Sequence, residues 1–158
     1  MECLTYQTEI MSEKKLQRDV SVSIRSSIRD LDTGDVNQIT SVCEGTITQT
    51  GAKTEIRYNE QLSDDGAPTV SLISFDDDDR GTVSVVREGE IGSAFFYTAG
   101  QRYYGQMDFG FMKLDVCVST SLLINTVTYA SGGKLEIRYK TEFRGSEAQD
   151  VDLNIRID

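Results

Sequence analysis

Apolar and polar residues alternate along most of the chain, which is typical of β-strands with one buried face. Between residues 19 and 25, Val20, Val22 and Ile24 take every second position, and Asp, Ser and Arg take the others. Successive side chains of a strand point to opposite faces, so this run predicts a half-buried strand. Similar runs predict strands over residues 38–48, 53–60, 70–75, 82–87, 94–97, 102–107, 112–123, 126–129, 134–143 and 151–157.

The segments between these runs are rich in Gly, Asp and Ser, the residues that favour tight turns. Val, Ile and Thr are abundant and Ala is scarce, which favours strands over helices. About ten short, closely spaced strands are typical of a sandwich or a closed barrel. We predict an all-β fold, a closed antiparallel up-and-down barrel of about eight to ten strands, because closure removes exposed strand edges.

The chain of 158 residues is long enough for one domain and too short for two. Residues 19–158 are predicted to form the barrel domain. Residues 1–18 lack the alternating pattern and are predicted to be an N-terminal extension, either loose or containing a short helix that begins at Ser12.

One segment of the sequence is partly repeated. Residues 51–58 end in Lys-Thr-Glu-Ile-Arg-Tyr, and residues 132–139 end in Lys-Leu-Glu-Ile-Arg-Tyr. Two similar hairpins on opposite halves of one barrel would explain the match. Chance convergence of two amphipathic strands would explain it equally well, because the match is short and occurs only twice.

Composition excludes several classes of function. The chain contains no His, which is the usual general base of hydrolytic triads and a common zinc ligand. The net charge of −10 would repel phosphate backbones and anionic lipid surfaces, so we expect neither nucleic acid nor membrane as a partner. We therefore expect a protein that is not an enzyme, with a histidine-free hydrolase as a distant alternative.

Cysteine usage and the N-terminus indicate a reducing compartment. Cys3, Cys43 and Cys117 are widely spaced and odd in number, so they predict free thiols rather than a disulfide framework or a zinc site. The N-terminus shows no signal peptide and no segment reads as a membrane span, so we expect a cytoplasmic protein.

Four consecutive aspartates, residues 76–79, suggest calcium at first sight. Counted from Asp76, however, the fifth and twelfth positions of an EF-hand loop would be Arg80 and Arg87, where oxygen ligands are required. The segment is better explained as a solvated hairpin tip. We expect neither a metal site nor a cofactor.

The two-residue period also places some polar side chains on the faces that carry the apolar residues. The face of residues 53–60 that carries Ile56 also carries a tyrosine and a glutamate, and the inward row of residues 134–143 includes a tyrosine. In residues 112–123 the inward row is predicted to run through Leu114, Val116 and Val118 to a threonine and then Leu122. The polar residues predicted to point into the barrel are Tyr58, Glu60, Arg87, Thr120 and Tyr139.

Glu60 and Arg87 admit three interpretations. They form an ion pair that closes one end of the barrel, because an unpaired buried charge costs several kcal/mol. Alternatively, Arg87 binds the anionic group of a ligand, with tyrosine hydroxyls beside it. In the third interpretation both residues emerge into solvent at the strand ends.

A set of short motifs follows in a fixed order from residue 19 to residue 158: Gly45, Tyr58, Glu60, Val83, Val85, Arg87, Gly89, Phe95, Phe109, Gly110, residues 112–120, Gly133, Leu135 and Tyr139. In these residues the chain resembles the YwiB-like proteins, a family of small bacterial proteins with a calycin-like, lipocalin-related barrel. The resemblance implies a closed antiparallel barrel, a cytoplasmic location and no assigned enzymatic activity.

Two functions therefore compete. The first is binding of a small apolar or amphipathic ligand inside the barrel, anchored by Arg87, Tyr58 or Tyr139, and it needs a cavity of roughly 300 Å³ or more. The alternative is a non-enzymatic interaction or regulatory module whose barrel is filled with side chains. Its outer face would bind a protein partner, a second copy of the chain included.

Overall fold

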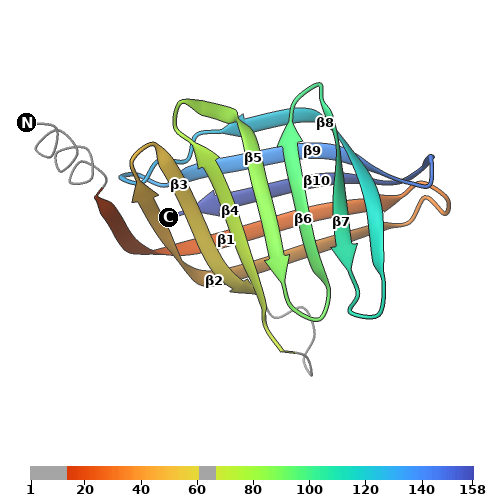
Figure 1. Ribbon diagram of the computed structural model, residues 1–158, viewed down its shortest axis with the longest axis horizontal. Helices are drawn as coiled ribbons and strands as arrows, with labels where there is room; N and C mark the ends of the chain where they lie inside the picture. Colours follow the sequence, from red (N-terminus) through yellow and green to blue (C-terminus); the bar gives the residue numbers. More distant parts are fainter. Residues whose placement is uncertain (1–13, 61–66) are drawn as a thin grey trace, which may run out of the picture.

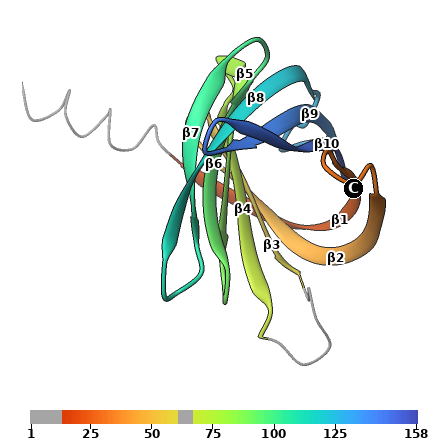
Figure 2. The same ribbon diagram turned by 90° about the vertical axis from the view of Figure 1, so that its right-hand side faces the viewer.

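The computed structural model describes residues 14–60 and 67–158, and their regular structure is entirely β. Each strand pairs antiparallel with the next one along the chain, and β1 pairs with β10, so the sheet closes into a barrel (Figures 1 and 2). The predicted closed antiparallel barrel is therefore confirmed. The ten strands are β1 Lys15–Asp30, β2 Val36–Thr50, β3 Lys53–Glu60, β4 Thr69–Asp76, β5 Asp79–Glu88, β6 Gly92–Thr98, β7 Arg102–Asp108, β8 Lys113–Asn125, β9 Gly133–Phe143 and β10 Ser146–Ile157.

Two segments differ from the sequence prediction. β1 begins at Lys15, before the expected domain boundary at residue 19. The remainder of the predicted extension, residues 1–13 with Cys3, lies outside the described residues. The strand predicted over residues 126–129 is wrong: the chain there forms an isolated bridge between Thr128 and Gly132.

The predicted inward faces of β3 and β9 are confirmed, but β8 departs from strict alternation. A register shift separates Thr120 from Leu122, so Leu122 lies opposite Arg138 and Leu123 lies opposite Ile137. An extra residue in one strand reverses which side chains face inward beyond it. The prediction that Leu122 points into the core is therefore wrong, and Leu123 packs against the core instead.

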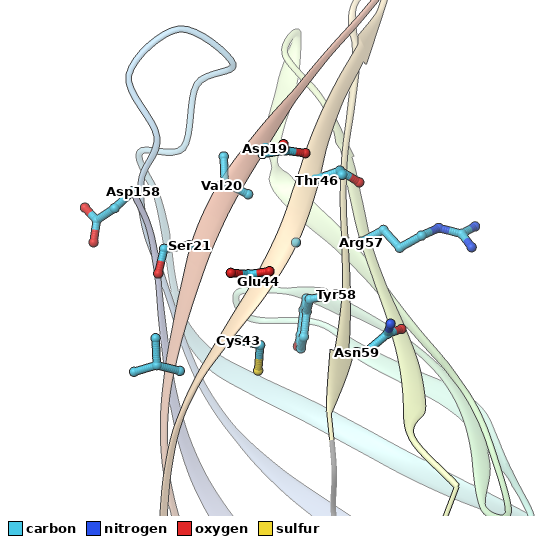
Figure 3. Close-up of a pocket in the computed structure, with 12 residues that line it drawn as sticks. Asp19, Val20, Ser21, Cys43, Glu44, Thr46, Arg57, Tyr58, Asn59 and Asp158 are labelled. Carbon is cyan, nitrogen blue, oxygen red and sulfur yellow. The ribbon is translucent and has the colours of Figure 1, made fainter.

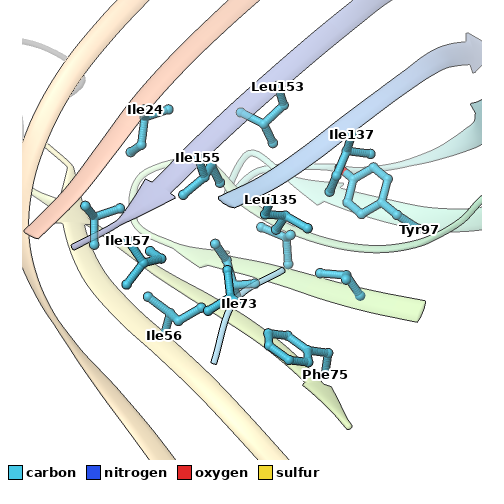
Figure 4. Close-up of a cluster of buried hydrophobic side chains, with 14 of the residues drawn as sticks. Ile24, Ile56, Ile73, Phe75, Tyr97, Leu135, Ile137, Leu153, Ile155 and Ile157 are labelled. Carbon is cyan, nitrogen blue, oxygen red and sulfur yellow. The ribbon is translucent and has the colours of Figure 1, made fainter. Parts of the chain in front are cut away.

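The core is a cluster of branched aliphatic and aromatic side chains drawn from every part of the barrel wall (Figure 4). Its most deeply buried members include Ile47, Ile56 and Ile73 of neighbouring strands and Leu135 and Ile137 of β9. Interiors pack at the density of organic crystals, so close contacts fix these positions. At Gly105, for example, an added Cβ atom would lie 2.2 Å from a ring carbon of Phe95.

One end of the barrel, which we call the capped end, is crossed by the connection between β8 and β9. Val127 of this connection is completely buried and belongs to the core. Arg80 of β5 donates a hydrogen bond to the carbonyl oxygen of Val127. Arg18 of β1 donates one to the carbonyl oxygen of Tyr129, at 2.6 Å. The connection is thus tied to two distant strands of the wall.

Asp77, in the turn between β4 and β5, completes the network of the capped end. Its carboxylate accepts hydrogen bonds from Gln49 at 2.6 Å and from Thr54 at 3.0 Å, and it lies 3.4 Å from Arg80. The Arg80 guanidinium also lies over the Phe75 ring, 5.3 Å from its centre. The aspartate run is therefore more than a solvated tip, because Asp77 satisfies three polar groups of the wall.

β2 is paired unequally on its two sides. It pairs with β1 from Val36 to Thr50, but with β3 only from Gly45 onward. Residues 36–44 therefore have a paired edge toward β1 and an edge toward β3 that no described strand covers. We call this second edge of residues 36–44 the free edge.

Candidate functional site

Opposite the capped end, the barrel interior changes from apolar to polar. A row of inward residues crosses neighbouring strands from Gly45 of β2 through Tyr58, Ser71 and Arg87 to Ser93 of β6. We call the interior around this row the polar end. Except for Thr54, the buried polar side chains in the described part of the chain lie on this side of the core: Ser26, Glu60, Thr69, Ser71 and Thr120.

The residues predicted to point inward are brought together here. Tyr58, Glu60 and Thr120 are buried, while Arg87 and Tyr139 are partly buried. Thr120 lies directly opposite Tyr139 on the neighbouring strand.

Arg87 lies at the centre of the group. Burial acts to lower the pKa of Arg87, but its acidic neighbours outweigh this effect and raise the pKa above its ordinary value; these neighbours are Tyr58, Glu60, Tyr139 and Tyr97. Tyr58 and Glu60 come from β3 and Tyr139 comes from β9, and these two strands are well separated in the ring of strands. The barrel thus holds a permanently charged guanidinium among three phenols and a carboxylate.

Of the three interpretations of Glu60 and Arg87, the ion pair is not found as a direct contact. No nitrogen of Arg87 lies within 4.0 Å of an oxygen of Glu60, and within residues 14–60 and 67–158 Arg87 donates no side-chain hydrogen bond. Both charges nevertheless affect Tyr58, whose pKa burial raises to about 12; Glu60 adds to this rise, whereas the charge of Arg87 and polar contacts from Ser71 and Arg87 oppose it. The guanidinium therefore lies near the Tyr58 hydroxyl and forms no direct ion pair with Glu60.

Three hydroxyl groups at the polar end are buried without a hydrogen-bond partner among the described residues. They belong to Tyr58, Ser71 and Thr120, whose exposed fractions are 2%, 0% and 4%. A buried hydroxyl that makes no hydrogen bond costs roughly 1–3 kcal/mol. Ser71 lies opposite Arg87 and Tyr58 lies opposite Ser71, whereas Thr120 lies opposite Tyr139. Unpartnered hydroxyls beside a guanidinium are typical of a place where an external molecule completes the hydrogen bonds.

Sequence reasoning missed two members of this group. Ser71 shares the inward face of β4 with Ile73 and Phe75, so the two-residue period could have identified it. Tyr97 is almost completely buried, and its ring lies 4.8 Å from the Tyr139 ring, centre to centre. Burial and the neighbouring Tyr139 raise the pKa of Tyr97 well above its ordinary value.

Three surface hollows border the group. The largest, about 900 Å³, lies where β2 separates from β3 and includes Tyr58 and Cys43 in its wall. In Figure 3 these two side chains lie between the β2 and β3 ribbons, whereas Arg57 points away from them. Two other hollows lie on the outer surface: one of about 380 Å³ includes Arg87 and Ser93 beside the exposed Ala94 and Gln106. The other, of about 450 Å³, includes Thr120 and Tyr139 beside the exposed Arg138 and Lys140.

Across the described residues there is no cluster of three or more Cys, Asp or Glu side chains arranged to hold a metal ion. The part of the chain described here also has no helix with the length and apolarity needed to cross a membrane. The candidate site is therefore the polar end, where Arg87 offers positive charge and the hydroxyls offer hydrogen bonds.

Comparison with known proteins supports the architecture. The profile of a family described as "Domain of unknown function (DUF1934)" matches residues 22–155. The crystal structure of the ywiB protein from Bacillus subtilis is similar, with a TM-score of 0.69 at 16% sequence identity, over 94% of this chain and 96% of that chain. At this identity the likeness establishes the fold alone. No curated protein matches the chain.

Proposed function

This chain belongs to the DUF1934 family, and we propose that it binds a small amphipathic molecule with an anionic group at the polar end of its barrel. Family membership and the barrel shared with the ywiB protein confirm the resemblance to YwiB-like proteins. The proposal itself rests on the interior of this chain.

The observation that carries the proposal is the combination of Arg87 with the three unpartnered hydroxyls. Arg87 is flanked by Ser71 and Ser93 on the two neighbouring strands, and Ser71 is flanked in turn by Tyr58. An anion beside Arg87 would accept hydrogen bonds from the guanidinium in a fork, as carboxylates and phosphates do. It would also accept hydrogen bonds from the Tyr58 and Ser71 hydroxyls, which no described residue now binds.

The surrounding wall favours an amphipathic ligand over a bare anion. On β4 and β5 the residues that follow Ser71 and precede Arg87 on the inward face are Ile73 and Val85, both almost completely buried. A ligand with its charged group at Arg87 would therefore direct an apolar body toward the core. Ligand sites in proteins commonly combine such apolar walls with a few fixed polar groups.

The experiment is a fluorescence titration with anilinonaphthalene sulfonate, which has apolar rings and a sulfonate, and with its uncharged parent phenylnaphthylamine. We expect the wild-type protein to bind the sulfonate more tightly than the parent. Arg87→Gln should weaken binding of the sulfonate about tenfold or more, since a charge-assisted hydrogen-bond pair is lost. Binding of the uncharged parent should change little.

The matched control is Arg25→Gln, which removes the same charge from an exposed position on the outer face of β1. It should leave both affinities unchanged. The proposal fails if neither probe binds the folded protein, or if Arg87→Gln and Arg25→Gln have the same effect on the sulfonate.

The alternative function, an interaction module, remains a prediction supported by a different region. The exposed large apolar side chains include Val36, Ile39 and Val42, which all lie on β2. Val36 and Val42 lie on the outward face of β2, whereas Ile39, which is paired with the buried Ser26 of β1, lies on the other face. Exposed apolar side chains of this kind mark candidate interaction sites on soluble proteins.

A further inference from the structure

The inward residues of β3, β4 and β5 form successive rows whose character changes toward the polar end. The rows, from the core outward, are Ile56, Ile73 and Val85; Tyr58, Ser71 and Arg87; and Glu60 with Thr69. Ile56 and Ile73 of the first row belong to the core cluster (Figure 4). This wall therefore offers an apolar surface, then a positive charge with hydroxyl groups, and then a negative charge.

Glu60 has no counter-ion among the described residues. It is the last residue of β3, its side chain faces inward, and its exposed fraction is 9%. Neither Glu60 nor Arg87 forms an ion pair within the part of the chain that the structure describes. A charge that is removed from water without a partner costs several kcal/mol. Each of the two charges therefore lacks a partner that a ligand could supply.

The sheet itself holds these two charges apart. Glu60 and Arg87 lie on strands that are separated by β4, and they belong to successive rows. Neighbouring strands are about 4.8 Å apart and successive inward residues of one strand about 6.6 Å apart, so the two Cα atoms are separated by roughly 12 Å. A molecule at this place can contact Arg87 with one group and Glu60 with another.

The surroundings of Arg87 on the side away from the core are acidic. The turn that follows Arg87 carries the exposed residues Glu88 and Glu90. Both line the hollow of about 380 Å³, together with Asp108, and Arg87 is the one basic residue among the described residues that line it. Arg87 therefore favours an anion, whereas the region outside it favours a cation.

We propose that the ligand is a zwitterionic amphiphile whose groups follow the order of the rows, with an apolar tail at the core, an anionic group at Arg87 and a terminal cationic group at Glu60. This inference rests on the proposed function and adds the cation and the order of the charges. A lysophospholipid has this order, because its phosphate lies between the tail and the ammonium group. A fatty acid or an alkyl phosphate would leave Glu60 unpaired and bring a second negative charge toward it.

The first test compares two zwitterions with the same tail and opposite charge order. Dodecylphosphocholine carries its phosphate next to the tail, whereas dodecyl sulfobetaine carries its ammonium there and its sulfonate at the end. Calorimetric titration below the critical micelle concentrations gives both dissociation constants. We expect the wild-type protein to bind dodecylphosphocholine about tenfold more tightly, because the sulfobetaine places its sulfonate toward Glu60.

The second test changes Glu60 and uses dodecyl phosphate as the ligand without a cation. Glu60→Gln should weaken binding of dodecylphosphocholine about tenfold, since the partner of the ammonium group is lost, and should leave binding of dodecyl phosphate unchanged or make it tighter. The matched control is Glu55→Gln, which removes the same charge from the outward face of β3. It should change neither affinity. Urea unfolding checks that both variants are folded.

The outcomes separate this inference from the proposed function. If dodecyl phosphate binds and Arg87→Gln weakens it, the anion site stands. In that case, equal binding of the two zwitterions, or equal effects of Glu60→Gln and Glu55→Gln on dodecylphosphocholine, would overturn the charge order. If none of the three amphiphiles binds the folded wild-type protein, the proposed function and this inference both fail.

Discussion

The two ends of the barrel interior differ in whether their polar groups are hydrogen-bonded. At the capped end, the Asp77 carboxylate accepts hydrogen bonds from Thr54 and Gln49, and Arg80 donates a hydrogen bond to the carbonyl oxygen of Val127. At the polar end, Arg87 forms no direct ion pair with Glu60, and three hydroxyls have no hydrogen-bond partner of normal geometry among the described residues. The difference indicates that the capped end is built for stability and that the polar end is built to bind another molecule.

The largest expected effect is a difference in the free energy of unfolding between variants of Arg80, at the capped end, and Arg87, at the polar end. Arg80→Leu removes the hydrogen bond to Val127 and the contact with Asp77, so we expect the free energy of unfolding to fall by about 2–4 kcal/mol. Arg87→Leu breaks no ion pair among the described residues and should change the free energy of unfolding by about 1 kcal/mol or less. Urea unfolding of both variants measures the difference. Equal losses would remove the distinction between the two ends.

A smaller effect should appear at alkaline pH. Burial raises the pKa of Tyr58 to about 12, while an unfolded tyrosine titrates near its model value of 10.0. The neutral hydroxyl is therefore favoured in the folded state, and its contribution is complete below pH 10 and is lost as the pH rises from about 10 to 12. Over this range the shift corresponds to about 2–3 kcal/mol of stability.

Tyr58→Phe provides the test, because it removes the ionisable group and keeps the ring. The variant should lose less stability than the wild type between pH 10 and pH 12, as followed by urea unfolding at each pH. The tyrosinate absorbance of the wild type should meanwhile show one phenol titrating near 12. The same alkaline loss in both proteins would mean that the Tyr58 hydroxyl is not held in its neutral form by the fold.

The sequence was sufficient for the architecture because strand periodicity is a local property. Alternation in residues 53–60 correctly predicted that Tyr58 and Glu60 face the same way as Ile56. It failed beyond Thr120, because a bulge depends on how two strands pair and leaves no mark in the apolar pattern of one of them. The two copies of the short repeat share one structural role. The tyrosines that end them, Tyr58 and Tyr139, both lie near Arg87 and raise its pKa.

The two networks that distinguish the ends were less accessible to sequence reasoning. Arg80 follows the aspartate run, so the sequence predicts only a charged hairpin tip there. Its hydrogen bond to the carbonyl oxygen of Val127 joins residues that are far apart in the sequence, which a local pattern does not predict. Likewise, the free edge follows from the point where β3 stops pairing with β2, and the side chains of β2 alone do not reveal it. Such long-range pairings depend on closure of the barrel, whereas inward and outward faces do not.

Two buried threonines provide the most direct measurement of the difference between the ends. Thr54 is completely buried and its hydroxyl donates to Asp77 at 3.0 Å, whereas the hydroxyl of Thr120, which is 4% exposed, has no partner among the described residues. In ligand-free protein, Thr54→Val should lower the free energy of unfolding by about 1–2 kcal/mol, and Thr120→Val should leave it unchanged or raise it by up to about 1 kcal/mol. If both substitutions cost the same, the hydroxyls of the polar end are satisfied by the fold itself, and the case for a ligand there is contradicted.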